Sequence, residues 1–178
     1  MCNLPHSIYS TKVVRQIDRT AIDDCGIVGY TLMTSAAMAV LDEACSFFPD
    51  AKQWQFVCGA GNNGGDGYVL ARLAAQQGIT VSVLALTPPD KLKGDAAIAY
   101  GDFVAGSGIV EAWGGSLDPH ADLIVDAMLG SGLIRDVEGQ FADAVNAINA
   151  HTSPVLAIDI PSGLDGDSGA IHNTVIRA

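Results

Sequence analysis

Carboxylate and amide side chains follow three apolar segments of this sequence, at the points where each segment ends. Asn62, Asn63 and Asp66 come after the first segment, and Asp126 and Asp159 end two later ones. Ligands of open α/β sheets bind outside the carboxyl ends of the strands, so we expect these side chains to converge on one crevice. Clustered carboxylates repel one another unless a cation lies among them or one of them is protonated.

The oxygen atoms expected at this crevice are hard ligands. Ser162 adds a hydroxyl to the Asn and Asp side chains, because it follows Asp159 by only three residues. Such oxygens, together with backbone carbonyls, suit K⁺, Ca²⁺ or Mg²⁺ better than zinc. The alternative is structural, since an aspartate at a strand end commonly accepts hydrogen bonds from loop amides. Asp126 and Asp159 could each serve only that purpose.

A glycine-rich stretch at 59–67 joins the first apolar segment to a helical pattern and lets the backbone approach a phosphate closely. Its Gly-x-Gly-x-x-Gly spacing fits the dinucleotide fingerprint, but that fingerprint needs an acidic residue at the tip of the next strand. The next predicted strand, 79–86, has none there. Asp66 would repel a bare phosphate, so it fits a cation or a reacting group better. The alternative is that Asp66 caps the helix.

A second flexible loop follows Asp126 and runs over residues 130–136, where its glycines permit a close backbone approach to a ligand. Arg135 is one of only nine Lys and Arg residues, and it could hold a phosphate. The alternative is a solvated surface charge. Because the net charge is -11, a phosphorylated ligand would need local means of binding: backbone N–H groups, a helix N-terminus or a bound cation.

Strand and helix patterns alternate from residue 54 onward. The strands are near-continuous apolar runs, as expected where both faces of a sheet are covered. The alternation predicts a mostly parallel sheet with right-handed crossovers, an α/β, doubly wound, Rossmann-like three-layer αβα sandwich with two extra N-terminal helices. The predicted strands are 54–57, 79–86, 109–113, 123–127 and 155–160, and the helices between them are 68–77, 91–105 and 141–150.

The two extra helices are predicted at 11–24 and 32–48, with Ser10 as an N-cap and Gly26 as a stop for the first. Their apolar residues could cover the sheet, form a lid or form a dimer surface, and we favour packing against the core. Residues 174–177 resemble the approach to another strand. This segment is either an edge element or a sign that the chain is a fragment.

Composition and charge argue against several classes of protein. A chain of 178 residues with 49% hydrophobic residues is long enough for one domain with a sizeable core and is not a disordered chain. The net charge of -11 makes nucleic acid and anionic membranes improbable partners. The four cysteines form no CxxC pair and fit reduced thiols, and no apolar run has the length of a membrane span. A cytoplasmic location is therefore the expectation.

Three sequence blocks together resemble the signature of the YjeF N-terminal domain, the NAD(P)H-hydrate epimerase family. They lie at 62–67, 125–132 and 159–164, in the order and spacing of that family. The resemblance covers nearly the whole chain, so we expect residues 1–178 to form one such domain, with 1–50 as its N-terminal helices. It implies an isomerase that interconverts the R and S epimers of hydrated NADH and NADPH, a repair reaction of nicotinamide nucleotides.

The resemblance also implies roles for individual residues. One K⁺ ion per subunit would be held by Asn63, Asp126 and Ser162. Epimerisation requires loss and return of the hydroxyl, or opening and reclosure of the ring, and either route needs a proton donor and acceptor. Our hypothesis is that Asp159 is the main acid/base and that Asp66 assists or orients. The residues implied to contact the substrate are Asn62, Asn63, Gly64, Gly65, Asp66, Gly130, Ser131, Gly132, Leu133, Ile134, Arg135, Asp136 and Asp159.

This sequence departs from the family pattern in its N-terminal block, where Thr34, Ser35 and Ala37 stand in place of the usual Glu, Arg and Gly. The family domain also usually continues through another strand and helix, so we expect a C-terminally truncated chain. Bacterial members are often fused to an NAD(P)HX dehydratase, the functional partner, which would be a C-terminal domain missing here. The resemblance further implies a homodimer.

Three other functions remain open from the sequence. The first is a non-catalytic ligand- or protein-binding module of the same fold, which would not need to keep Asn63, Asp66, Asp126, Asp159 and Ser162. The second is an NAD-dependent oxidoreductase, against which the missing acid after strand 79–86 argues. The third is an inactive fragment of a larger enzyme.

Overall fold

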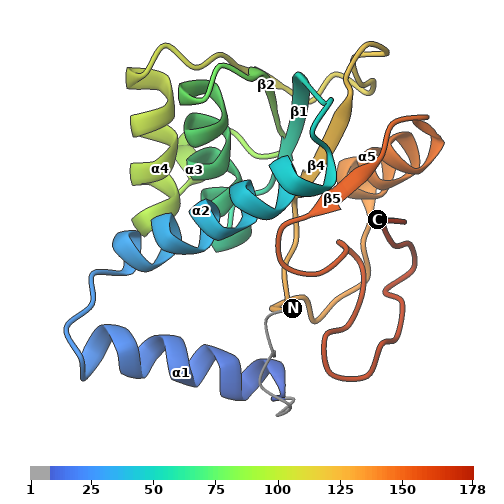
Figure 1. Ribbon diagram of the computed structural model, residues 1–178. Coiled ribbons are helices and arrows are strands. Elements are labelled where there is room, and N and C mark those ends of the chain that lie inside the picture. Colours follow the sequence, from blue (N-terminus) through green and yellow to red (C-terminus); the bar gives the residue numbers. More distant parts are fainter. Residues whose placement is uncertain (1–8) are drawn as a thin grey trace.

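A five-stranded sheet forms the centre of the molecule, as the computed structural model, which describes residues 9–178, shows (Figure 1). All paired strands are parallel, and their order across the sheet is β3-β2-β1-β4-β5. The winding direction reverses between β1 and β4, which is the position where open sheets of this kind bind ligands. The strands are β1 Gln53–Cys58, β2 Thr80–Ala85, β3 Val110–Ala112, β4 Leu123–Ala127 and β5 Val155–Ala157.

Helices cover both faces of this sheet and confirm the predicted three-layer α/β fold. Three helices pack on one face, where β1 contributes Trp54, Phe56 and Cys58 to the larger core. One helix packs on the other face, where β1 contributes Val57 and β4 contributes Ile124. The first group is α2 Gly29–Phe47, α3 Asn62–Gln76 and α4 Gly94–Ala105; the other helix is α5 Gly139–Ala150, and a short 3₁₀ turn η1 spans Pro89–Lys91.

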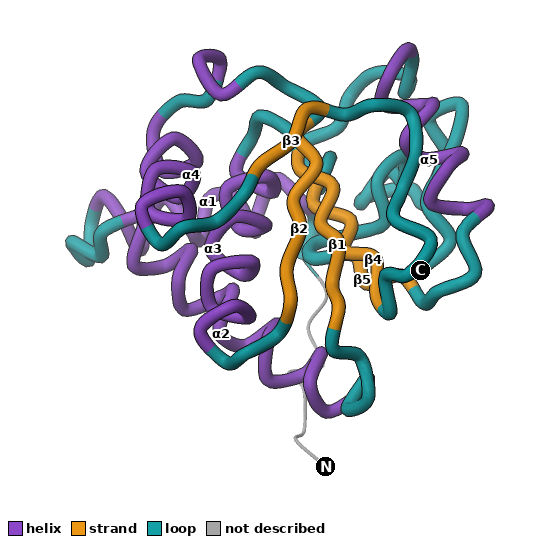
Figure 2. The backbone as a smooth tube through the Cα atoms, turned by 90° about the horizontal axis from the view of Figure 1, so that it is seen from above, coloured by secondary structure: helices purple, strands orange, loops and turns teal. Residues whose placement is uncertain are grey.

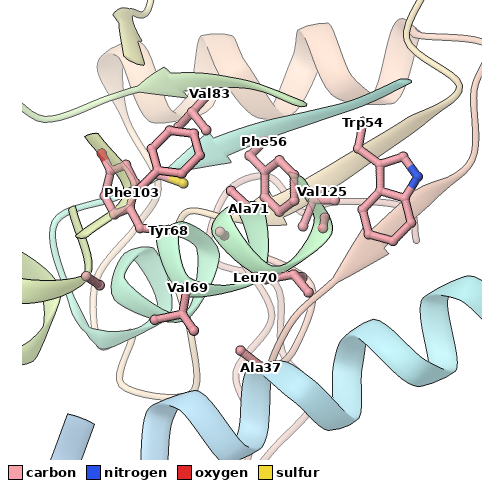
Figure 3. Packing of buried hydrophobic residues seen from close by; sticks show 14 of the residues in the cluster. Ala37, Trp54, Phe56, Tyr68, Val69, Leu70, Ala71, Val83, Phe103 and Val125 are labelled. Carbon is pink, nitrogen blue, oxygen red and sulfur yellow. The ribbon is translucent and has the colours of Figure 1, made fainter. Parts of the chain in front are cut away.

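The larger core is built around aromatic side chains, shown close up in Figure 3. Trp54 and Phe56 project from β1 toward α3, and Tyr68 on α3 packs edge-on against Tyr100 of α4 with ring centroids 5.4 Å apart. All but Tyr100 belong to the set of fully buried side chains. Each such side chain removes a large apolar area from water, so this layer fixes α3 firmly against β1.

The predicted strands all occur, but the last one ends earlier than expected. We predicted it to continue to Ile160, whereas β5 stops at Ala157. The Ile158 amide still donates to the Asp126 carbonyl at 3.1 Å, and the chain then turns toward Pro161, which has no N–H to donate to a ladder. Asp159 and Ser162 therefore stand on a loop beyond the sheet edge, above the end of β4.

The two N-terminal helices behave differently, and the expectation that both pack against the core is correct only for the second. Helix α2 buries Met33, Ala37, Leu41 and Ala44, and Ala37 faces Leu70 of α3 in Figure 3. Helix α1, Thr11–Asp23, buries no residue. It runs below the three layers in Figure 1, and the tube view in Figure 2 shows α1 to α4 on one side of the strands and α5 on the other.

The segment 174–177 is not a strand in this structure. It is a loop with Ile176 buried at 3% exposure, and the Ile176 amide donates to the Ser162 carbonyl at 3.0 Å. Asn149 of α5 holds it from the other side, donating to the Val175 carbonyl at 2.8 Å. The segment thus supports the Ser162 loop instead of extending the sheet. Within residues 9–178, no helix is both long and apolar enough to cross a membrane.

Candidate functional site

Helix α3 begins at Asn62, six residues earlier than the sequence pattern predicted, so the block 62–67 forms its first turns. Gly61 occupies the N-cap, with no side chain capping the helix. The amides of the first turn are therefore free to face a ligand, and they carry the partial positive charge of the helix end. Because Asp66 lies in the second turn, the alternative that it caps the helix is wrong.

The glycines of this block allow α3 to press against the sheet. A side-chain carbon on Gly64 would collide with the Gly59 carbonyl oxygen. One on Gly67 would lie 2.5 Å from the Ala127 Cβ and 2.9 Å from the Cys58 Sγ. Both spaces are too small for any side chain, so these glycines bring the helix N-terminus directly over the ends of β1 and β4.

Asn63 is a buried polar side chain without a partner. Only 8% of Asn63 is exposed, and both its amide nitrogen and its amide oxygen are buried with no hydrogen bond. A side-chain carbon on Gly130 would lie 3.4 Å from Asn63 Cβ, so the amide stands beside the loop after β4. Unpaired buried amides are costly and uncommon in native proteins. A ligand atom at this point would satisfy it.

Asp126, at the end of β4, is fully buried and linked to Ser162. The Ser162 amide donates to Asp126 Oδ2 at 2.8 Å, and the Ser162 hydroxyl lies 2.6 Å from Asp126 Oδ1. The Met128 amide adds a third bond, at 3.2 Å. Burial raises the pKa of Asp126 to about 6, although the bonds from Ser162 and Met128 oppose that rise. Asp126 thus accepts loop amides, as the structural alternative proposed, and lies with Ser162, one of its predicted co-ligands.

Asp159 is exposed and is held by the loop after β4. The Ser131 amide donates to Asp159 Oδ2 at 2.7 Å. A side-chain carbon on Gly130 would lie 2.6 Å from the same oxygen, so any other residue here would displace the carboxyl. Gly130 therefore lies close to both Asp159 and the unpaired Asn63 amide.

Asp66 is partly buried and lies near other carboxyl groups. Burial, aided by the neighbouring carboxyls of Asp159 and Asp18, raises the pKa of Asp66 to about 7. A carboxyl with this pKa holds a proton for about half the time at neutral pH and can donate or accept one. The structure thus brings Asp66 and Asp159, predicted from different sequence blocks, into electrostatic contact.

The remaining residues of the loop 130–136 divide into buried and exposed ones. Leu133 packs against the smaller core, whereas Ile134 is 88% exposed. Asp136 lies 3.9 Å from the His172 ring nitrogen. Arg135 is exposed, and within residues 9–178 it makes no ion pair or side-chain hydrogen bond. Both interpretations of Arg135, an anion contact and a solvated charge, remain compatible with this placement.

Helix α1 contributes residues that the sequence did not single out. The Thr11 amide and hydroxyl donate to the Asp167 carboxylate at 2.7 and 2.9 Å. A side-chain carbon on Gly132 would lie 3.3 Å from Arg15 Nη1, and Asp18 is near enough to raise the pKa of Asp66. The spacing of Thr11, Arg15 and Asp18 places them on one helical face, and this was the available signal.

Two surface hollows lie away from these residues. One, of about 400 Å³, is lined by Val13, Gln16, Ile17 and Thr20 on the outer side of α1. Another, of about 260 Å³, lies near Arg72 and Phe103. Among the residues that the structure describes, no three His, Cys, Asp or Glu side chains gather as a metal site. A cation at the candidate site would rest on the Asp126 carboxyl and neutral oxygens.

Comparisons with known proteins agree with the signature blocks. The family model described as YjeF-related protein N-terminus matches residues 29–178. The bifunctional NAD(P)H-hydrate repair enzyme Nnr of Escherichia coli K12 is 39% identical over 176 residues, covering 99% of this chain and 34% of that enzyme. The NAD(P)H-hydrate epimerase of Limosilactobacillus reuteri strain SD2112 is 38% identical over 172 residues, covering 96% of this chain and 81% of that protein.

The fold also matches a solved structure. The crystal structure of yeast ynu0, YNL200c, has a TM-score of 0.82 and 25% sequence identity, covering 96% of this chain and 76% of that one. The present chain spans about a third of the length of the bifunctional relatives and about four fifths of the epimerase from L. reuteri. With a family model matched over most of its residues, the chain belongs to the family of YjeF-related protein N-terminal domains.

Proposed function

We propose that this chain is an NAD(P)H-hydrate epimerase, an isomerase that interconverts the R and S epimers of hydrated NADH and NADPH. The observation that carries the proposal is the placement of two carboxyl groups at the ligand-binding edge of the sheet: Asp66 in the second turn of α3, and Asp159 held by the Ser131 amide near enough to raise the pKa of Asp66. The relatives named NAD(P)H-hydrate epimerase, such as that of L. reuteri at 38% identity, supply the substrate.

The chemistry assigns a proton transfer to each carboxyl. The hydrate carries its hydroxyl on a carbon of the reduced nicotinamide ring. Inverting that carbon requires loss and return of the hydroxyl, or opening and reclosure of the ring, and both routes pass a proton to or from oxygen or nitrogen. We assign Asp159 as the main acid/base, oriented by the Ser131 amide, and Asp66 as the group that assists it. A pKa of about 7 for Asp66 suits either direction of transfer at neutral pH.

The dinucleotide would bind across the two loops that flank these carboxyls. The free amides of the α3 N-terminus, at Asn62 and Asn63, favour an anionic group. Gly64 and Gly65 keep side chains away from this edge, and Gly130 leaves Asp159 accessible. The residues proposed to contact substrate are thus those of 62–66 and 130–136, with Asp159.

The residues proposed for K⁺, Asn63, Asp126 and Ser162, fit such an ion. Asn63 offers an unpaired buried oxygen, and the Asp126 oxygens have lone pairs beyond those used by Ser162 and Met128. One carboxylate among neutral oxygens is a donor set for a weakly charged, hard cation. When bound, K⁺ would supply positive charge to anionic groups of the substrate.

The test is conversion of the purified R epimer of hydrated NADH to the S epimer, followed by chromatography. Reactions contain K⁺, Na⁺ or no protein. We expect a protein-dependent rate well above the spontaneous one, a preference for K⁺, and loss of most activity in Asp159→Asn. Asp42→Asn, an exposed change on α2, is the matched control and keeps full activity. A rate equal to the blank from folded protein would refute the epimerase and favour a non-catalytic binding module.

The family resemblance adds three further parts to this proposal. We propose that the protein is a homodimer, that it works in the cytoplasm, and that an NAD(P)HX dehydratase consumes the S epimer that it makes. The bifunctional relatives, whose printed name covers the whole repair, are the support for the last part. Size-exclusion chromatography with light scattering tests the homodimer, and a coupled assay with added dehydratase tests consumption of the S epimer.

A further inference from the structure

Helix α1 lies against the candidate site through its polar face. Thr11, Arg15, Asp18 and Ile22 recur at spacings of four, three and four residues, so they line one side of the helix. Each of them reaches the rest of the molecule: Thr11 binds Asp167, and the other three lie near Gly132, Asp66 and Gly29 in that order.

The apolar side of α1 faces outward. Val13, Val14 and Ile17 are 38%, 44% and 52% exposed, and the helix buries no residue. An amphipathic helix ordinarily turns its apolar stripe to the core, because that burial is what stabilises it. Here polar contacts place the helix, so its position depends on the side chains that face the site and on the Thr11–Asp167 tether.

Arg15 is the positive charge that this arrangement places at the loop after β4. Its Nη1 lies 3.3 Å from the point where a side-chain carbon on Gly132 would stand. Its one side-chain hydrogen bond is a long one, 3.3 Å to the Thr11 hydroxyl, and none of the ion pairs found within residues 9–178 involves it. An arginine without a carboxylate partner keeps its planar set of donors available for an anion.

The distribution of Lys and Arg residues also favours an anion-binding role for this part of α1. The chain has a net charge of -11 and only nine Lys and Arg residues, yet Lys12, Arg15 and Arg19 lie within two turns of α1. Arg135 stands on the facing loop. A phosphate-bearing ligand approaching an acidic protein would be repelled over most of its surface, and these cationic side chains would offset the repulsion from Asp18 and the nearby carboxyls.

We propose that Arg15 of α1 binds a phosphate group of the dinucleotide, holding it against the backbone of Gly130–Gly132. This inference rests on the proposed epimerase function and adds a fourth segment to the site, beyond the three signature blocks. The phosphate is either part of the diphosphate bridge, present in both substrates, or the 2′-phosphate found only in the NADPH hydrate. Guanidinium donors match both groups geometrically.

Steady-state kinetics of Arg15→Gln, Arg15→Lys and wild type, with the hydrates of NADH and of NADPH, test the proposal. We expect Arg15→Gln to raise KM about tenfold or more, the loss of one charge-assisted hydrogen bond, with kcat little changed. Arg15→Lys should recover part of that loss. A rise in KM for both substrates identifies the diphosphate as the group that Arg15 binds, and a rise in KM for the NADPH hydrate alone identifies the 2′-phosphate. Lys91→Gln, which removes an equal charge from η1, should leave KM unchanged.

A binding experiment separates this inference from the epimerase proposal. Titration of NADP⁺ and NAD⁺ into the same proteins by calorimetry needs no turnover, and thermal melts show whether each variant is folded. Arg15→Gln should weaken binding about tenfold even if wild type proves inactive as an epimerase. Equal affinities of folded Arg15→Gln and wild type, an equal loss in Lys91→Gln, or no binding by wild type would each overturn the role of Arg15.

Discussion

Replacing Asp66 by Asn should change how the folding stability depends on pH. Burial, aided by the Asp159 and Asp18 carboxyls, raises the pKa of Asp66 from 3.8 to about 7. Between these values the folded protein keeps a proton on Asp66 that the unfolded chain has lost. The resulting contribution to stability is fully present below about pH 4 and is lost as the pH rises through about 7.

The size of this effect follows from the two pKa values. A shift from 3.8 to about 7 corresponds to about 4 kcal/mol in the free energy of unfolding, and about 2 to 3 kcal/mol of it falls between pH 5 and 8. Asp66 is partly exposed, and solvent screening reduces this figure. Asp66→Asn has a similar shape and no charge. It should therefore gain at least about 1 kcal/mol over wild type between pH 5 and pH 8.

Urea unfolding followed by fluorescence measures this difference, because Trp54 is fully buried and reports loss of the core. Tetramethylammonium chloride as the only salt keeps candidate cations out of the site. Asp42→Asn removes the same charge from an exposed position on α2 and should track wild type at both pH values. If Asp66→Asn and wild type lost stability in parallel from pH 5 to 8, the environment assigned to Asp66 would be wrong.

Three further substitutions test the packing of the site. Gly64→Ala should lower the free energy of unfolding by about 1 to 3 kcal/mol, because its methyl group has no space against the Gly59 backbone. Gly101→Ala, in an open part of α4, should raise the stability slightly. Urea unfolding of the two variants measures both changes. Ser162→Ala should cost about 1.5 to 3 kcal/mol by the same measurement, since it removes a hydroxyl bonded to a buried carboxyl. Gly130→Ala should keep the free energy of unfolding within about 1 kcal/mol of wild type but lower epimerase activity about tenfold or more, because it displaces Asp159. Unchanged activity would contradict the place assigned to Asp159.

The sheet and its ligand-binding edge could be predicted because their signals are local. Buried parallel strands read as apolar runs, and the strand ends then dictate which acids meet. This is why Asp66, Asp126 and Asp159 were recognised from sequence, and the structure brings Asp66 and Asp159 together. The bond between Asp126 and Ser162 follows from the same geometry, because β5 lies next to β4.

Other features depended on tertiary contacts that local patterns do not encode. Glycines disfavour a helix in isolation, so 62–67 was interpreted as a loop, yet in the structure the same glycines start α3 because only they fit against β1 and β4. The apolar spacing of α1 predicted core packing, but polar partners on loops far along the chain decide its orientation. Arg15 was overlooked for the same reason.

The tether between Thr11 and Asp167 joins groups 156 residues apart in the chain. During synthesis α1 emerges long before its anchor exists, while the strands and helices between them can pair as they leave the ribosome. Until Asp167 has been synthesised, α1 is therefore an amphipathic helix without its tether. Docking of α1 would then be a late step, so a nascent chain could acquire a folded core well before α1 lies against the candidate site.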